Sequence, residues 1–204
     1  MHRRRMSGMV PLTNKKPKVL GLGLSKTGTK SLREALLFLG YSNHSWSPTL
    51  LERWFAGDLE ALLAVTDAYD CVEDWPFLAA YSELMDRYGA SARYILTLRK
   101  NPNIWLDSMI AHAERIAPEH DVHRRMAFGY DNPKRYKAEY LTYYDRHNDG
   151  VRAAIAERGL KHCFAELCWE NGDGWSDLCK LIGRAPPDRP FPHRNRRPDL
   201  LPGA

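Results

Sequence analysis

Residues 18–32 read Lys18-Val19-Leu20-Gly21-Leu22-Gly23-Leu24-Ser25-Lys26-Thr27-Gly28-Thr29-Lys30-Ser31-Leu32. The apolar run predicts a buried strand, and the small and hydroxylated residues after it predict a loop that leads into a helix. Such a turn directs several backbone N–H groups and the positive end of a helix dipole at one point. We therefore expect this segment to bind a phosphorylated ligand, although a glycine-rich turn with only a packing role has the same pattern.

The spacing of Gly23 and Gly28 fits the loop G-x-x-x-x-G-K-[ST], which holds nucleoside triphosphates, but the next residue does not. Thr29 stands where that motif has its lysine. Lys30 comes one position later, and at ~100° per residue its side chain turns away from the cradle. The strongest cation within the loop is Lys26, so the sequence predicts a different kind of anion loop.

A second predicted strand, residues 92–98, runs directly into Arg99. Asn101 is a suitable N-cap and Pro102 a suitable first residue for the helix that follows. Arg99 is thus expected at the carboxyl end of a strand and Ser108 two turns into a helix. A guanidinium offers a planar fork to phosphate oxygens, and a hydroxyl completes the shell. The alternative is an arginine in a surface ion pair and a serine that faces solvent.

A third segment, residues 69–76, reads as a short strand ended by a proline and followed by a helix from residue 77 to about 88. It carries two neighbouring carboxyl groups, Glu73 and Asp74. Successive strand residues point to opposite faces, so at most one of the two should face a cleft. The alternative is that both acids cap the next helix or pair with Lys26.

These segments resemble the sulfotransferases that take a sulfuryl group from 3′-phosphoadenosine 5′-phosphosulfate (PAPS). Residues 25–31 match the 5′-phosphosulfate loop of that family, although Lys30 replaces a residue that is usually threonine. The resemblance implies that Lys26 contacts the bridging oxygen and assists the leaving group. In the same family a strand that ends in Arg-Asn or Arg-Asp, with a serine eight or nine residues later, clamps the 3′-phosphate. That role falls to Arg99 and Ser108.

The resemblance also implies a catalytic base. In the family the corresponding strand ends in His-x-Pro, or carries a carboxylate in a branch that acts on sugars, and Asp74 occupies this position two residues before Pro76. A carboxylate beside a cationic loop needs a partly desolvated pocket to raise its pKa enough to act as a base. Glu73, His44 and His147 remain alternative bases.

The carboxyl end carries a fourth resemblance. Residues 174–183 and the Phe-Pro-His-Arg-Asn run at 191–195 are similar to the end of one widespread small branch of the family. A closing tail would add an arginine to the 3′-phosphate site, whereas a solvated tail would not. The nucleotide-binding residues implied are Ser25, Lys26, Thr27, Gly28, Thr29, Lys30, Ser31, Arg99, Ser108 and Arg194.

The order of predicted strands and helices indicates one α/β domain with a central parallel sheet and helices on both faces. At 204 residues with 44% apolar content, the chain can bury one such core. The resemblance makes this a P-loop-NTPase-like sulfotransferase fold. We expect a basic leader over residues 1–17, the domain over 18–183 and a Pro/Arg-rich tail over 184–204 that packs on or near the nucleotide site. Residues 117–132 are expected to form an irregular loop.

The net charge of +5 comes from the two ends of the chain. Residues 1–18 hold six Lys or Arg and no acid, and residues 184–204 hold five Arg and two Asp. The body between them has more acids than bases, which disfavours nucleic acid as a partner. No apolar run approaches the ~18 residues of a membrane span, so we expect a cytoplasmic enzyme, a monomer or homodimer, with a small-molecule acceptor and no membrane contact. The four cysteines lack metal-ligand spacing, and no metal is expected.

Two other functions fit the sequence. One is a nucleotide-dependent kinase or NTPase that uses Lys30 in a distorted loop and needs a carboxylate for Mg²⁺. The other is a protein that binds PAPS, or its product adenosine 3′,5′-bisphosphate (PAP), without turnover.

Overall fold

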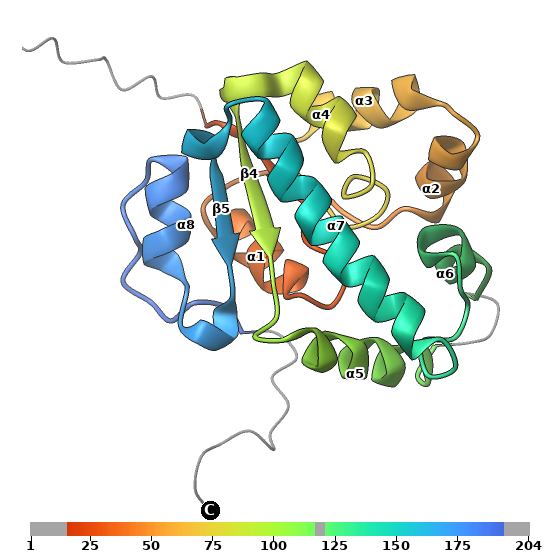
Figure 1. The fold of residues 1–204 in the computed structure, drawn as a ribbon. Coiled ribbons are helices and arrows are strands. Elements are labelled where there is room, and N and C mark those ends of the chain that lie inside the picture. The colour runs from red at the N-terminus through yellow and green to blue at the C-terminus, as the bar shows by residue number, and fades with distance from the viewer. Residues whose placement is uncertain (1–15, 117–120, 194–204) are drawn as a thin grey trace, which may run out of the picture.

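The computed structural model describes residues 16–116 and 121–193, and Figure 1 shows the arrangement of their elements. Five strands form one sheet in the order β2-β3-β1-β4-β5, and every neighbouring pair is parallel. The strands are β1 (Lys18–Gly21), β2 (Asn43–His44), β3 (Cys71–Glu73), β4 (Ala92–Thr97) and β5 (Phe164–Leu167). The predicted α/β class with a central parallel sheet is confirmed.

Helices follow most of the strands, as the sequence predicts. They are α1 (Thr29–Phe38), α2 (Pro48–Phe55), α3 (Leu59–Ala68), α4 (Tyr81–Tyr88), α5 (Pro102–Ala113), α6 (Asp121–Phe128), α7 (Lys137–Glu157) and α8 (Trp175–Ile182). Short 3₁₀ turns lie at η1 (Gly89–Ser91), η3 (Lys161–Cys163) and η4 (Trp169–Asn171). The predicted N-cap of α5 is confirmed, because the Asn101 side chain accepts the N–H of Ile104 at 3.1 Å.

Two sequence predictions need correction. The helix expected from residue 77 begins only at Tyr81, because the chain first forms a separate turn in which Ala79 N–H donates to the carbonyl of Pro76. The segment 117–132, expected to be an irregular loop, contains α6. Few residues of α6 are apolar, but Ala127 and Phe128 are buried against α7, so tertiary packing stabilises this helix.

Strand alternation distributes the core over both faces of the sheet. On one face Leu20, Val72 and Tyr94 pack against α3, α4 and α7. On the other face Val19 and Ile95 pack against α1 and α8. Figure 1 shows the same layering, with α7 in front of the sheet and α1 behind it. Burial on both faces explains why the strands read as continuous apolar runs.

A third apolar cluster closes the carboxyl edge of the sheet. Leu24 and Trp75, which follow β1 and β3, pack with Trp105 of α5 and with aromatic residues of α6 and α7. Trp105 is fully buried, and its indole N–H donates to the carbonyl of Ser25 at 2.9 Å. This cluster therefore packs against the loop after β1 and stabilises it.

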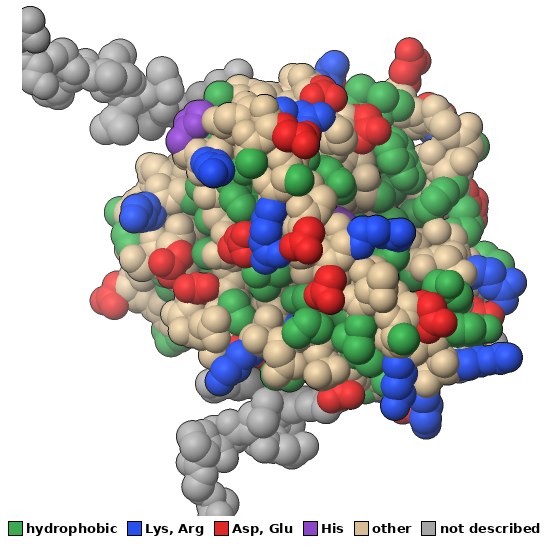
Figure 2. Space-filling view, viewed as in Figure 1, with side chains coloured by type: hydrophobic (Ala, Val, Ile, Leu, Met, Phe, Trp, Pro, Cys, Tyr) green, Lys and Arg blue, Asp and Glu red, His purple; other side chains and the backbone are tan. Residues whose placement is uncertain are grey.

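The surface carries both signs of charge. On the face shown in Figure 2, basic and acidic side chains are interspersed, and no broad patch of one sign is visible there. In the part of the chain that the structure describes, no helix has the length and apolar character needed to cross a lipid bilayer.

Gly23 marks the closest approach of the loop to the sheet. A Cβ atom at this position would lie 2.0 Å from Oγ1 and 2.5 Å from the carbonyl oxygen of Thr97 in β4. No side chain other than hydrogen fits without a shift of strand β4. By contrast, a Cβ at Gly57 meets nothing within 4 Å, although its φ of +85° is left-handed.

We predict that Gly23→Ala lowers stability by roughly 2–3 kcal/mol or more, because the new methyl group overlaps backbone atoms of β4. Gly57→Ala is the matched control and should lose only about 1 kcal/mol, from the left-handed backbone alone. Urea unfolding monitored by circular dichroism measures both. Equal losses in the two variants would contradict the close approach at Gly23.

Candidate functional site

The loop between β1 and α1 is held from inside by its own residues and by β4. The Thr27 hydroxyl is 2.6 Å from the Leu24 carbonyl and 2.6 Å from the Thr97 hydroxyl, and the Thr27 N–H donates to Leu24 as well. Thr27 is fully buried. Thr27 therefore stabilises the loop from inside, and both its hydroxyl and its N–H already form hydrogen bonds within the protein.

The open side of the loop presents backbone donors. Helix α1 begins at Thr29, and Ser31 N–H donates to the Gly28 carbonyl at 3.0 Å. Within the described residues, no hydrogen bond uses the N–H groups of Gly28, Thr29 or Lys30. Together with the helix dipole, three such donors have the chemistry to hold an anion, and we call them the cradle.

Gly28 is required in this cradle for two reasons. Its φ is +103°, and a Cβ would lie 2.3 Å from the indole ring of Trp169. The Trp169 indole N–H donates to the Gly28 carbonyl at 3.1 Å. The turn η4 after β5 is thus fixed against the first turn of α1.

Lys26 occupies a strained position in the loop. Its φ is +74°, a region that residues with a Cβ seldom adopt. Burial lowers the pKa of Lys26, as do the positive charges of Lys30 and Arg115, while Asp74 acts in the opposite direction. Lys26 is thus partly buried, and the cations Lys30, Arg115 and Arg99 lie near it.

The cationic surroundings extend onto α5. Burial, together with the charges of Lys26, Arg124 and Arg115, lowers the pKa of His112 to about 4. Sequence reasoning missed His112 and Arg115. A signal was present, because Ser108 and His112 are four residues apart on one side of α5, and Arg115 follows in the turn after the helix. His112 thus lies partly buried near the cations Lys26, Arg124 and Arg115.

Asp74 reaches the loop from the end of β3. The Ser25 hydroxyl donates to Asp74 Oδ1 at 2.5 Å, and the Trp75 N–H donates to the same oxygen at 2.9 Å. Burial raises the pKa of Asp74, against the effect of these two hydrogen bonds. Its φ of +67° is left-handed, so Asp74 lies beyond the strand and strand alternation does not set its direction. The contact between Ser25 and Asp74 was not predicted.

Glu73 is the last residue of β3 and is only 1% exposed. Arg33 of α1 lies 3.7 Å away, and neither carboxylate oxygen has a well-formed hydrogen bond among the described residues. Burial raises the pKa of Glu73 to about 7, and the charge of Asp74 adds to this effect. Among the described residues, α4 has no side-chain cap from Glu73 or Asp74, while the charges of Asp74 and Lys26 act on each other's pKa.

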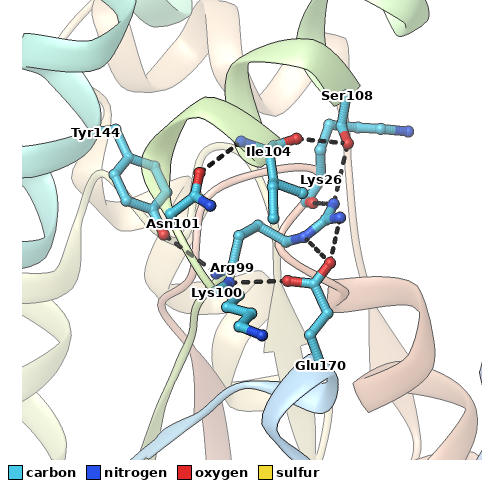
Figure 3. Close-up of polar contacts among 8 residues, drawn as sticks. All are labelled: Lys26, Arg99, Lys100, Asn101, Ile104, Ser108, Tyr144 and Glu170. Carbon is cyan, nitrogen blue, oxygen red and sulfur yellow. Dashed lines mark hydrogen bonds and ion pairs between the residues drawn. The ribbon is translucent and has the colours of Figure 1, made fainter. Parts of the chain in front are cut away.

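Arg99 and Ser108 meet as predicted (Figure 3). Arg99 Nη1 donates to the Ser108 hydroxyl oxygen at 3.0 Å and to the carbonyl of Lys26 at 3.1 Å. The Ser108 hydroxyl itself donates to the Ile104 carbonyl at 2.9 Å. Sequence reasoning missed a further partner, Glu170 of η4, whose carboxylate forms an ion pair with Arg99 at 2.5 Å.

The remaining predicted residues lie at or outside the edge of this site. Lys30 is exposed, in accord with its turned position. His147 is buried, with Nε2 2.8 Å from the Leu22 carbonyl, and His44 packs against Tyr69 and Phe77. Arg194 lies outside the described residues.

The described part of the tail contacts the core near the cradle. The Phe191 ring lies 4.5 Å from the ring of Trp169 and 5.1 Å from that of Trp175, measured between centroids. Through Trp169, this aromatic group also touches Gly28.

The family model described as "Sulfotransferase domain" matches residues 18–200. The chain belongs to the sulfotransferase family. The resemblance found in the sequence is therefore confirmed, and the match includes all four segments that carry it.

A relative of this sulfotransferase is the "Ava biosynthesis cluster protein M" of Aspergillus versicolor. The two are 28% identical over 218 residues, which cover 86% of this chain and 80% of the relative. As a member of the family, this chain has a domain built for sulfuryl transfer.

We predict that Glu73→Gln stabilises this sulfotransferase increasingly as the pH rises from 5 to 8. The folded-state pKa of Glu73 is raised above its ordinary value, so its stabilising contribution is complete below that ordinary value and is lost as the pH rises through about 7. The neutral amide does not suffer this loss, and Tm should rise by about 2–4 °C for each kcal/mol recovered.

Thermal unfolding at pH 5, 6, 7 and 8 measures the difference between the variant and the parent protein. Glu166→Gln is the control, because Glu166 pairs with Arg152 on the exposed side of β5. A difference for Glu73→Gln that stays constant with pH would contradict the burial of an ionisable carboxyl group at this position.

Proposed function

We propose that this protein transfers a sulfuryl group from PAPS to a hydroxyl or amine of a small-molecule acceptor. The observation that carries the proposal is the meeting of two separate anion-binding elements at the carboxyl edge of one sheet. One is the N–H cradle of the loop, and the other is Arg99 at the end of β4. PAPS carries charged groups at both its 5′ and 3′ positions, so it matches such a pair.

The cradle is proposed to hold the 5′-phosphosulfate. The open N–H groups of Gly28, Thr29 and Lys30 supply neutral donors, and the cations around Lys26 supply charge. Arg99 is proposed to bind the 3′-phosphate. In this arrangement Ser108 holds the guanidinium, since its hydroxyl proton is already donated to Ile104.

Asp74 and Lys26 are proposed to divide the chemical work. As the acceptor oxygen forms its bond to sulfur, Asp74 takes the proton from that oxygen. The bond between sulfur and the bridging oxygen breaks, and its electron pair stays on the 5′-phosphate, where Lys26 stabilises the charge. A raised pKa makes the Asp74 carboxylate a stronger base, and Ser25 orients it.

Glu73 supports this division of roles. Two buried neighbouring carboxyl groups seldom ionise together, so they titrate as a pair. Arg33 and the hydroxyls near Glu73 favour its charged form only in part, and its pKa stays raised to about 7. We propose that a proton held on Glu73 leaves Asp74 free to ionise beside Lys26.

The choice of nucleotide tests this function. PAP without metal should stabilise the protein in a thermal-shift assay, by ~2.7 kcal/mol at a hundredfold excess over Kd. Arg99→Ala should weaken PAP binding about 10–150-fold, as expected for the loss of a charge-assisted contact, and should leave the affinity for adenosine 5′-monophosphate (AMP) nearly unchanged.

Arg152→Ala is the matched control, because Arg152 also forms an ion pair with a glutamate but lies on the exposed side of α7. Calorimetry gives Kd for both ligands. Equal losses for PAP and AMP in Arg99→Ala would contradict the assignment of the 3′-phosphate. A preference for ATP with Mg²⁺ over PAP would favour a kinase or NTPase instead.

The role of Asp74 as the base is tested by a substitution. Asp74→Asn keeps the shape of the side chain and removes its basicity, so kcat should fall by roughly 10²–10⁴ while the Kd for PAP changes little. PAP release from PAPS in the presence of a panel of phenols, alcohols and amines measures turnover. Asp86→Asn, at an exposed ion pair with Arg158, is the control.

Retained turnover in Asp74→Asn would move the base to Glu73 or a histidine. Tight PAP binding by the parent protein, without turnover of any acceptor, would favour a protein that binds the nucleotide and does not react with it.

A further inference from the structure

Glu170 fills the donor set of Arg99 (Figure 3). Its Oε1 accepts from Arg99 Nε at 3.0 Å and from Arg99 Nη2 at 2.5 Å. Its Oε2 accepts the backbone N–H of Lys100 at 2.8 Å. One carboxylate thus accepts hydrogen bonds from three N–H donors, two on Oε1 and one on Oε2.

The other edge of the Arg99 guanidinium has few N–H groups without a partner among the described residues. Nη1 uses its two N–H groups on the Lys26 carbonyl and the Ser108 hydroxyl. With Glu170 in place, a single N–H, on Nη2, remains without a partner among the described residues. A phosphate cannot find a charge-assisted pair of donors on Arg99 while this carboxylate stays where it is.

We propose that Glu170 is a displaceable stand-in for the 3′-phosphate of the nucleotide. The phosphate takes over Arg99 Nε, Arg99 Nη2 and the Lys100 N–H, and Glu170 turns away. This inference rests on the proposed function. Glu170 thereby sets the affinity for 3′-phosphorylated nucleotides, and it returns to Arg99 when the product leaves.

The local structure permits this exchange. Trp169 fixes the backbone of η4 by its bond to Gly28, so Glu170 changes only its side-chain rotamer. The Glu170 side chain is 28% exposed, which gives it a path to solvent. A phosphate monoester carries more negative charge than a carboxylate, so it competes well for the same donors.

The test is the affinity of the Glu170→Gln variant for PAP and AMP, measured by calorimetry. Removing the competing charge should lower Kd for PAP roughly 3- to 30-fold. The lower end of this range corresponds to the loss of a typical partly exposed ion pair. Kd for AMP should not change, because AMP lacks the 3′-phosphate. Most of the gain should appear as slower PAP dissociation in stopped-flow measurements.

Glu166→Gln is the matched control, because this glutamate also accepts two hydrogen bonds from one arginine but lies on β5. Glu170→Asp is the second variant. Its shorter side chain reaches Arg99 less well, so it should tighten PAP binding less than Glu170→Gln does, and it serves if the amide variant does not fold.

Suppose that the parent protein prefers PAP to AMP and loses that preference with Arg99→Ala, as the proposed function requires. Unchanged or weaker PAP binding in both Glu170 variants would then overturn the inference and leave the proposed function intact. Unchanged binding means that Glu170 stays aside from the phosphate, and weaker binding means that it positions Arg99 for it. A parent protein that binds PAP no better than AMP would overturn both proposals.

Discussion

The loop after β1 depends on one steric constraint, the contact of Gly23 with the backbone of β4. Because no side chain separates the two, the Thr97 hydroxyl reaches Thr27, and Thr27 in turn binds the Leu24 carbonyl. These contacts fix the start of α1 and leave its first N–H groups facing outward. The same approach places the end of β4 beside the loop, so Arg99 reaches the Lys26 carbonyl.

Electrostatic balance in the site follows from how the elements meet at the carboxyl edge of the sheet. The loop, the turn after α5 and the end of β4 bring cations together, whereas the segments of β3 and η4 bring acids. The acids differ in their burial: Glu170 is partly exposed and bound to Arg99, while Glu73 is enclosed and its pKa is raised to about 7. The same edge of the sheet thus contains a partly exposed carboxylate bound to an arginine and buried carboxyl groups whose pKa is raised.

Much of this arrangement could be predicted from the sequence, where the signal was local. The strand-loop-helix pattern at residues 18–32, the Arg99 and Ser108 spacing and the N-cap at Asn101 all arise within one or two turns of chain. The ion pair of Arg99 with Glu170 joins residues 71 positions apart, so no local pattern indicates it. The left-handed backbone at Asp74 was also hidden, because the strand pattern of residues 71–73 gives no sign that it stops there.

The Lys26 carbonyl gives the site a property that no single side chain provides. Its bond to Arg99 joins the loop on one side of the site to the guanidinium on the other through one peptide group. The spacing between the loop and the Arg99 guanidinium is therefore fixed through a backbone carbonyl and does not depend on the Lys26 side chain. A change of the Lys26 side chain leaves this carbonyl in place, so under the proposed function the spacing of the 5′ and 3′ sites is set by the fold.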